Sequence, residues 1–293
     1  MKEVSIIIPN HNSPVIDQVC LALHQQTYDL THVEVIIVGT DDLDLICCDE
    51  LVRFIPTGQD MNAAVNRNIG IENAQGAILV FLDSDCLPGE EWLSAHHSRH
   101  AAGEKVVGGA FAFDDHNYWQ LADNLSAFHE WLPFTNLKPR LYVPAANLSV
   151  QRDVLNAAGL MLPFLDLAED LEWTIRIRNL GYSLFFEPRA LVKHAPPRNT
   201  FPAVWRHWYY NAKYTLWVRW RYRAALDTPG LARHHALYLF FAPVIALWAT
   251  AKTFSHAKTR RDHMTTLPIV YLTKLIWCLG AFFNFPDIEG TVP

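Results

Sequence analysis

Short apolar runs alternate with amphipathic stretches through the first part of the chain. Each run rich in Val, Ile, Leu or Phe predicts a buried strand. The predicted strands are residues 4–8, 33–38, 52–55 and 77–82. Between them, the apolar spacing predicts helices over residues 14–26 and 62–74, with Gly76 as the C-cap of the second. This order indicates an α/β fold with a mostly parallel sheet, which binds ligands at the carboxyl ends of its strands.

The pattern changes near the C-terminus, where two long apolar runs occur. Between Arg233 and Lys252 lie 18 uncharged residues, and between Asp262 and Asp287 lie 24 residues with Lys274 as the one charge. A helix that crosses a bilayer needs about 20 apolar residues, so both runs are borderline. The basic turn between them opposes a crossing, because basic loops stay on the cytoplasmic side. Two shallow or re-entrant helices are therefore favoured, and a packed helical domain or a dimer interface is the alternative.

The net charge of −6 conceals an uneven distribution. Residues 1–188 hold 10 Lys and Arg against 26 Asp and Glu, whereas residues 189–293 hold 14 against 4. Between Arg189 and Leu226 there are eight basic residues and no acidic one. Because this stretch directly precedes the apolar runs, an anionic membrane surface explains it better than a nucleic acid does. We therefore expect no nucleic-acid partner.

Composition narrows the class of protein further. Of the 293 residues, 51% are hydrophobic and ten are Trp, which excludes a disordered chain. The five cysteines lack metal-ligand spacing and fit a reducing compartment; they are Cys20, Cys47, Cys48, Cys86 and Cys278. The few residues before the first strand are too short for a signal peptide.

Two carboxylates follow the strand of residues 77–82. Asp83 and Asp85, separated by Ser84, are expected on the loop at its carboxyl end. A carboxylate there is costly unless a cation or a donor compensates it. Two at this spacing can share one hard divalent ion, Mn²⁺ or Mg²⁺, and leave sites for phosphate oxygens. The alternative is an ordinary turn, in which Asp and Ser are common.

Five motifs in order give the chain a resemblance to the family 2 glycosyltransferases of the GT-A fold, over roughly residues 3–225. The motifs are the first strand with its turn at residues 9–12, then residues 66–70, 83–85, 144–152, and 169–170 with 176–182. The resemblance implies a GT-A catalytic domain at residues 1–225. Residues 226–293 are then a C-terminal hydrophobic helical region, which is interfacial, re-entrant or transmembrane.

The resemblance also assigns site residues. Those expected at the nucleotide sugar are Pro9, Asn12, Asp41, Arg67 and Asp83, and those expected at the metal are Asp85, Asp83 and His194. Asp170 is the expected catalytic base, since a base must take the proton of the acceptor hydroxyl and a helix start tolerates a carboxylate. Those expected on the acceptor side are Asn147, Glu169 and Trp173. Ordinary structural positions remain the alternative for Arg67, His194, Asn147 and Trp173.

Two departures from the family pattern bear on specificity. The second strand of the family usually ends in Asp-Asp-Gly-Ser, whereas here Val38 is followed by Gly39-Thr40-Asp41-Asp42. The carboxylate that would contact the base or ribose therefore arrives two positions late. Polymerising members carry Gln-x-x-Arg-Trp, and the nearest match, residues 216–220, lacks the Gln. A single sugar addition is therefore expected.

Together these features predict a metal-dependent, inverting glycosyltransferase at the cytoplasmic face of a membrane, expected to be a bacterial inner membrane. The donor is a nucleotide-diphosphate sugar, with UDP favoured and GDP or TDP as alternatives. The acceptor is lipid-linked, or a saccharide delivered at an anionic membrane surface, and an oligomer is compatible with the sequence. Two other classes remain: a non-catalytic membrane scaffold, and a nucleotidyltransferase, which would normally have a Gly-rich loop where this chain has residues 10–14.

Overall fold

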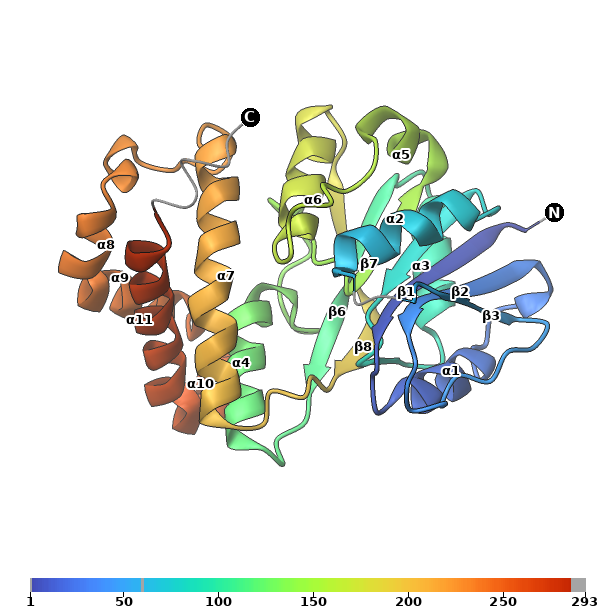
Figure 1. Cartoon of the computed structure of the whole chain (residues 1–293), viewed down its shortest axis with the longest axis horizontal. Helices are drawn as coiled ribbons and strands as arrows, with labels where there is room; N and C mark the ends of the chain where they lie inside the picture. The colour runs from blue at the N-terminus through green and yellow to red at the C-terminus, as the bar shows by residue number, and fades with distance from the viewer. Residues whose placement is uncertain (1, 59–60, 286–293) are drawn as a thin grey trace. The chain divides into compact units, whose positions relative to one another are not determined.

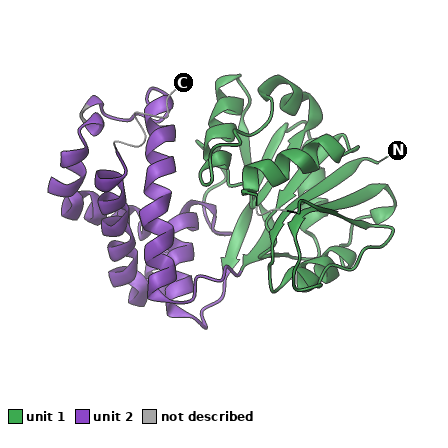
Figure 2. Cartoon of the chain, viewed as in Figure 1, with its two compact units in different colours: residues 1–112, 136–194 green, residues 113–135, 195–293 purple. Residues whose placement is uncertain are grey.

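The chain forms two compact units in the computed structural model, which describes residues 2–58 and 61–285. Unit 1 contains the residues up to 112 together with 136–194, and unit 2 contains 113–135 together with the chain from 195 onward (Figure 2). The division differs from the predicted one at residue 225. The long helix α7 (Phe201–Arg221) belongs to unit 2, because it packs along the C-terminal helix α11 (Leu267–Phe283).

Unit 1 is built on an eight-stranded sheet, in the order β3-β2-β1-β4-β7-β6-β8-β5 within the described residues (Figure 1). The parallel half comprises β3 (Val52–Pro56), β2 (Val33–Thr40), β1 (Val4–His11) and β4 (Ile78–Leu82). The other strands are β7 (Asn147–Gln151), β6 (Val106–Phe113), β8 (Leu184–His194) and β5 (Cys86–Pro88). β7 is antiparallel to β4 and β6, and β5 is antiparallel to β8. The sheet is therefore mixed, and its parallel half holds the four strands expected at the N-terminus.

In the described part of unit 1, five helices connect these strands. They are α1 (Ile16–His24), α2 (Ala63–Asn73), α3 (Trp92–Ala101), α5 (Arg152–Ala158) and α6 (Glu169–Asn179), with a short 3₁₀ turn at Leu30–His32. Both helices predicted between the first strands, over residues 14–26 and 62–74, are confirmed with slightly shorter bounds. The core lies where β4 and β7 pack on α5 and α6, and within it the ring of Phe81 lies edge-on to Trp173.

The two ends of α2 are fixed in different ways, and the end expected to involve Gly76 differs from the expectation. The side chain of Asn62 accepts a hydrogen bond from the backbone N–H of Val65 and so caps the helix start. Gly76 is not a left-handed C-cap: the C-cap is Ala74, at φ −80°, and Gly76 itself does not have a positive φ. Gly76 is instead required by packing, since a Cβ there would lie 2.6 Å from the backbone nitrogen of Ser5 in β1.

Apart from Phe113, the last residue of β6, the regular secondary structure in the described part of unit 2 is helical. Its helices are α4 (Tyr118–Phe128), α7, α8 (His235–Phe240), α9 (Ala242–Thr253), α10 (Ala257–His263) and α11, with 3₁₀ turns at His129–Trp131, Gly230–Arg233 and Met264–Thr266. α11 packs against α7, α9, α8 and α4. Gly280 allows the closest approach, because a Cβ there would lie 2.2 Å from the carbonyl oxygen of Tyr209 in α7.

The two apolar runs adopt different structures. The first is divided into α8 and α9, and the second forms α11, although Asp287 at its far end lies outside the described residues. Among the described residues, one helical stretch, Ala257–Phe283, has the length and composition to cross a membrane. Lys274 within it is turned into unit 2, where its Nζ donates to the Ser126 carbonyl oxygen at 2.8 Å and lies over the Trp208 ring.

Candidate active site

The Asp83-Ser84-Asp85 segment forms a tight turn directly after β4. The backbone N–H of Cys86 donates to the Asp83 carbonyl oxygen at 3.0 Å, which closes the turn. The hydroxyl of Ser13, from the loop after β1, donates to the Ser84 carbonyl oxygen at 2.8 Å. Asp83 and Asp85 are 30% and 20% exposed, so solvent or a ligand can reach both carboxylates. The turn is thus fixed through its backbone, and both acidic side chains remain partly exposed.

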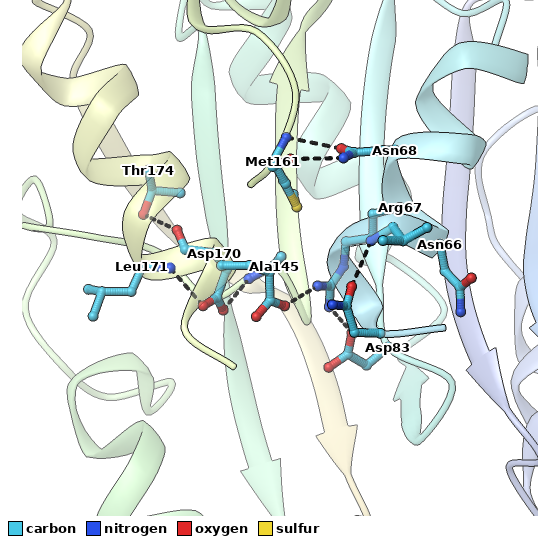
Figure 3. Close-up of polar contacts among 12 residues, drawn as sticks. Asn66, Arg67, Asn68, Asp83, Ala145, Met161, Asp170, Leu171 and Thr174 are labelled. Carbon is cyan, nitrogen blue, oxygen red and sulfur yellow. Dashed lines mark hydrogen bonds and ion pairs between the residues drawn. The ribbon is translucent and has the colours of Figure 1, made fainter. Parts of the chain in front are cut away.

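Arg67, on α2, joins this turn to the start of α6. Its Nη2 lies 2.5 Å from Oδ1 of Asp83 (Figure 3). Its Nη1 donates to Oε1 of Glu169. The Arg67 side chain is only 3% exposed. Burial opposes its charge, but the attraction of Asp83 and Glu169 outweighs burial and raises the pKa of Arg67. The guanidinium is therefore a permanent charge that holds the two acidic segments together.

Asp170 is held by backbone amides at the start of α6. Its Oδ2 accepts from the N–H of Ala145 at 3.0 Å and its Oδ1 accepts from the N–H of Leu171 at 2.7 Å (Figure 3). Ala168, just before the helix, has φ +63°, a left-handed conformation that costs free energy in a residue with a Cβ. Burial raises the pKa of Asp170 above its usual value. Burial, and then the charge of Asp170, raise the pKa of Glu169 to about 7. A carboxylate in such a setting is a stronger proton acceptor than one in water.

A second constellation gathers around Asp85. Nε2 of His194, at the end of β8, lies 3.6 Å from Oδ1 of Asp85. The Sγ of Cys86, the first residue of β5, lies 3.9 Å from the same oxygen. Burial, and then the charges of Asp85 and Asp83, raise the pKa of the Cys86 thiol. Oxygen, nitrogen and sulfur donors that converge in this way fit a divalent cation. The two aspartates thus have different neighbours: Asp83 pairs with Arg67, and Asp85 lies with His194.

The carboxyl ends of β1 and β2 lie side by side. β2 continues two residues beyond its predicted end, so Asp41 follows the strand directly. Gly39 makes the extension possible, since a Cβ there, at φ +140°, would lie 1.8 Å from the carbonyl oxygen of Asn10. Asn12, at φ +50°, accepts from the N–H of Asp42 at 2.6 Å and donates to the Asp42 carboxylate at 2.9 Å.

Some buried polar atoms of this region lack a hydrogen-bond partner among the described residues. They are Oδ1 of Asp41, Oδ1 of Asn66 and Nε of Arg67. Such atoms are costly unless a ligand or water satisfies them. The other oxygen of Asp41 accepts from the N–H of Ile46 at 2.8 Å, so the side chain is already oriented. Pro9 lies partly buried within β1, opposite Val38. The region is therefore suited to a polar ligand.

Two residues expected on the acceptor side lie in the core. Asn147 is fully buried: its Nδ2 donates to the carbonyl oxygens of Ala110 and Ala190, and its Oδ1 accepts from the indole N–H of Trp92. Trp173 is also fully buried, and its indole N–H donates to the Gly159 carbonyl oxygen at 2.8 Å. These are the core positions that the sequence left open. Residues around the site that sequence reasoning missed are Ala145, whose N–H fixes Asp170, and Cys86.

The fold and these carboxylates define a class of enzyme, the nucleotide-sugar transferases of the GT-A fold. The chain shares its fold with the mannosyltransferase PcManGT from Pyrobaculum calidifontis, solved in complex with GDP-Man and Mn²⁺. The TM-score is 0.63 at 16% sequence identity, and the match covers 97% of this chain and 87% of that chain. The profile of Glycosyl transferase family 2 matches residues 5–151, half of the chain, and the chain belongs to this family.

Relatives named as glycosyltransferases support the same assignment. Glycosyltransferase AglE of Haloferax volcanii is 29% identical over 289 residues, which cover 94% of this chain and 91% of AglE. Probable glycosyltransferase YdaM of Bacillus subtilis is 23% identical over 158 residues, which cover 51% of this chain and 36% of YdaM. The predicted family, fold class and enzyme class are confirmed. The chain is a glycosyltransferase with a nucleotide-sugar donor, in place of the nucleotidyltransferase and scaffold alternatives.

Proposed function

We propose that this enzyme transfers one sugar, with inversion, from a nucleoside-diphosphate donor to an acceptor hydroxyl, and that Asp170 is the base. The observation that carries the proposal is the Arg67 bridge. It ties Asp83, on the turn after β4, to Glu169, the neighbour of Asp170. The donor-side carboxylate and the base are thereby fixed in one rigid cluster, as a direct displacement requires.

The residues of this cluster divide the work of the reaction. Asp85 and His194 would hold a divalent cation, Mn²⁺ or Mg²⁺, which supplies neutralising charge for the departing diphosphate. Asp170 takes the hydroxyl proton as the acceptor oxygen bonds to the anomeric carbon, while the bond from that carbon to the diphosphate oxygen breaks. The two amide N–H groups of Ala145 and Leu171 orient the Asp170 carboxylate for this transfer. The backside attack inverts the anomeric configuration.

A sugar-nucleotide panel tests this proposal. The full-length protein is incubated with UDP-, GDP- and TDP-sugars, with Mn²⁺, Mg²⁺ or chelator, and release of the nucleoside diphosphate is measured. UDP-sugars are the first candidates, since Asp41, although two positions later than the family's base-reading carboxylate, directly follows β2. GDP-mannose is included because PcManGT was solved with it. Turnover that is unchanged by chelator would remove the metal from the mechanism, and a product with retained configuration would remove the single displacement.

Exposed apolar side chains on unit 2 support a membrane location. Phe240, Val244, Leu247 and Trp248 recur at helical spacing along α8 and α9, and they are 77%, 63%, 63% and 69% exposed. We refer to these four as the apolar stripe. An apolar face of this kind is unfavourable in water and favourable in a lipid interface, where basic residues near the end of α9 add attraction to anionic headgroups. We therefore propose that unit 2 lies on the cytoplasmic face of a membrane and that the acceptor is lipid-linked.

The structure favours attachment in the interface over a crossing. α8 and α9 have 6 and 12 residues, too few to span the roughly 30 Å hydrocarbon layer. The α10–α11 stretch is longer, but Lys274 in its middle packs against Trp208 inside unit 2. Not every aromatic residue of α7 can meet lipid, because Trp208 and Trp217 are buried. The stripe is therefore the proposed contact.

Vesicle flotation tests the stripe in the full-length protein. Val244→Asn/Leu247→Asn/Trp248→Gln should reduce binding to anionic phosphatidylglycerol vesicles and leave donor hydrolysis intact. A matched control is Leu21→Asn/Leu180→Asn, which removes exposed leucines from unit 1. Equal binding by the two variants would reject the stripe as the membrane contact. A change from dimer to monomer in the triple variant, without an effect on flotation, would make the stripe a dimer interface.

A further inference from the structure

A thiol lies among the side chains that the proposed function assigns to the cation. Cys86 is the cross-strand partner of His194 in the β5–β8 pair. Partners directly opposite each other on antiparallel strands project to the same face of the sheet. Asp85 comes immediately before Cys86, and one ligand atom from each of the three residues lies within 4.8 Å of the others. The strand register therefore brings sulfur, nitrogen and oxygen donors together.

The separations fit coordination of one ion. Bonds of about 2.3 Å to sulfur and about 2.1 Å to nitrogen or oxygen, at tetrahedral angles, place ligand atoms about 3.4–3.6 Å apart. The observed distances from Oδ1 of Asp85 are 3.6 Å to Nε2 of His194 and 3.9 Å to Sγ of Cys86. A contraction of a few tenths of an ångström would close the site. Cys86 and His194 are buried, so packing already holds two of the three donors.

We propose that Cys86 is a protein ligand of the cation and that it makes the site prefer Co²⁺ and Zn²⁺ over Mg²⁺. The inference rests on the proposed function, which gives the cation to Asp85 and His194. Mg²⁺ prefers oxygen ligands and keeps its waters, whereas thiolate and imidazole favour softer ions, with Mn²⁺ between the two groups. On binding, the thiol gives its proton to water, because a coordinated thiol is deprotonated.

Cobalt absorption tests the ligand directly, apart from activity. The full-length protein is used with Cys47→Ser/Cys48→Ser as background, because these two thiols are exposed and could bind cobalt themselves. Titration with Co²⁺ alone should give a thiolate-to-cobalt charge-transfer band in the near ultraviolet. Cys86→Ser should remove the band and weaken Co²⁺ binding by about tenfold or more. Binding of Mg²⁺ should change by less than about twofold, because serine keeps an oxygen at the site.

Other thiols provide the controls. Cys20→Ser and Cys278→Ser alter buried thiols on α1 and α11 and should keep the band. A band that survives in Cys86→Ser and Cys86→Ala, or that is absent from the background protein at saturating Co²⁺, overturns the proposal. If neither Cys86 variant folds, cadmium-113 NMR of the background protein decides. A chemical shift of a sulfur-ligated ion supports the proposal, and a shift of an oxygen–nitrogen site overturns it.

Asp85→Asn separates this inference from the proposed function. In one outcome, Asp85→Asn loses both Co²⁺ binding and sugar transfer, whereas Cys86→Ser keeps both. This result would exclude Cys86 as a ligand and would support metal-dependent transfer. In the other outcome, the cobalt band depends on Cys86 but turnover does not change when metal is removed. It would keep the ligand assignment and overturn metal-dependent catalysis.

Discussion

Replacement of Arg67 by methionine is the sharpest test of the cluster formed by Arg67, Asp83 and Glu169. The change removes one buried positive charge and leaves two carboxylates without their ion-pair partner. Breaking a buried ion pair on one side costs about 3–5 kcal/mol when the other partner stays charged. Asp83 is 30% exposed and regains hydration, whereas Glu169 is nearly fully buried and does not. The cost therefore falls mainly on Glu169.

The pH determines how much of this cost is felt. Burial raises the pKa of Glu169 to about 7 even with Arg67 present, and loss of the cation raises it further. A carboxyl group whose pKa is raised on folding destabilises the fold as pH increases above its unfolded value. At pH 6, below this pKa, Glu169 is mostly protonated in both proteins, so the variant loses mainly the charged hydrogen bond to Asp83, about 2 kcal/mol. At pH 8 the loss grows to about 3–4 kcal/mol, because one pKa unit corresponds to about 1.4 kcal/mol.

Urea unfolding followed by tryptophan fluorescence measures this difference, since Trp92 and Trp173 are buried in unit 1. Arg53→Met is a matched control: Arg53 is half-exposed, 3.9 Å from Glu34, and should cost less than about 1 kcal/mol at either pH. Arg67→Met/Glu169→Gln should lose the pH dependence. An equal loss at pH 6 and pH 8 in Arg67→Met, or no loss at either, would refute the assignment of Glu169 as its charge partner.

Three further changes test the site. Asp170→Asn keeps the shape of the side chain but cannot accept a proton, so turnover in a diphosphate-release assay should fall by about 10²–10⁴; donor affinity from calorimetry should stay within twofold, and a large drop in that affinity would contradict a role on the acceptor. Asp85→Asn should abolish metal-dependent nucleotide binding with the melting temperature little changed, whereas Asp83→Asn should also lower the melting temperature, because Arg67 loses a partner. Gly39→Ala should unfold the donor site, because its Cβ would lie 1.8 Å from a carbonyl oxygen. The control Gly103→Ala, whose Cβ would have nothing within 4 Å, should cost only about 1–3 kcal/mol of backbone strain. Similar unfolding midpoints for the two glycine variants would argue against the close approach of β1 and β2.

Local patterns were sufficient for the first half of the fold. Parallel strands buried on both faces are continuous apolar runs, so β1, β2 and β4 are visible in the sequence with nearly correct bounds. The extra length of β2 was missed because Gly39 is usually a strand breaker. Here a glycine is required, because the neighbouring strand passes so close that a Cβ would not fit. The antiparallel half depends on long-range pairings, which no local pattern encodes.

Local sequence patterns also predicted only part of the site. The Asp83–Asp85 turn and the Glu169–Asp170 helix start are local motifs, and both are found where the sequence predicts them. The contact between Arg67 and Glu169 joins residues 102 positions apart, so the sequence offered Arg67 as a ligand of the nucleotide or as an ordinary structural residue, and not as this bridge. The core position of Asn147 follows from four partners on three other elements. The roles of these residues toward donor, metal and acceptor stay predictions.

The discontinuity of unit 2 has a consequence for the synthesis of this protein. α4 is made before the last strands of unit 1, yet its apolar residues Leu121 and Leu125 are covered by Val270 of α11. At ordinary elongation rates of about 5–20 residues per second, the nascent chain carries that uncovered face for on the order of ten seconds. A polypeptide released before residue 267 would therefore have a complete sheet but an uncovered, aggregation-prone apolar helix in its middle.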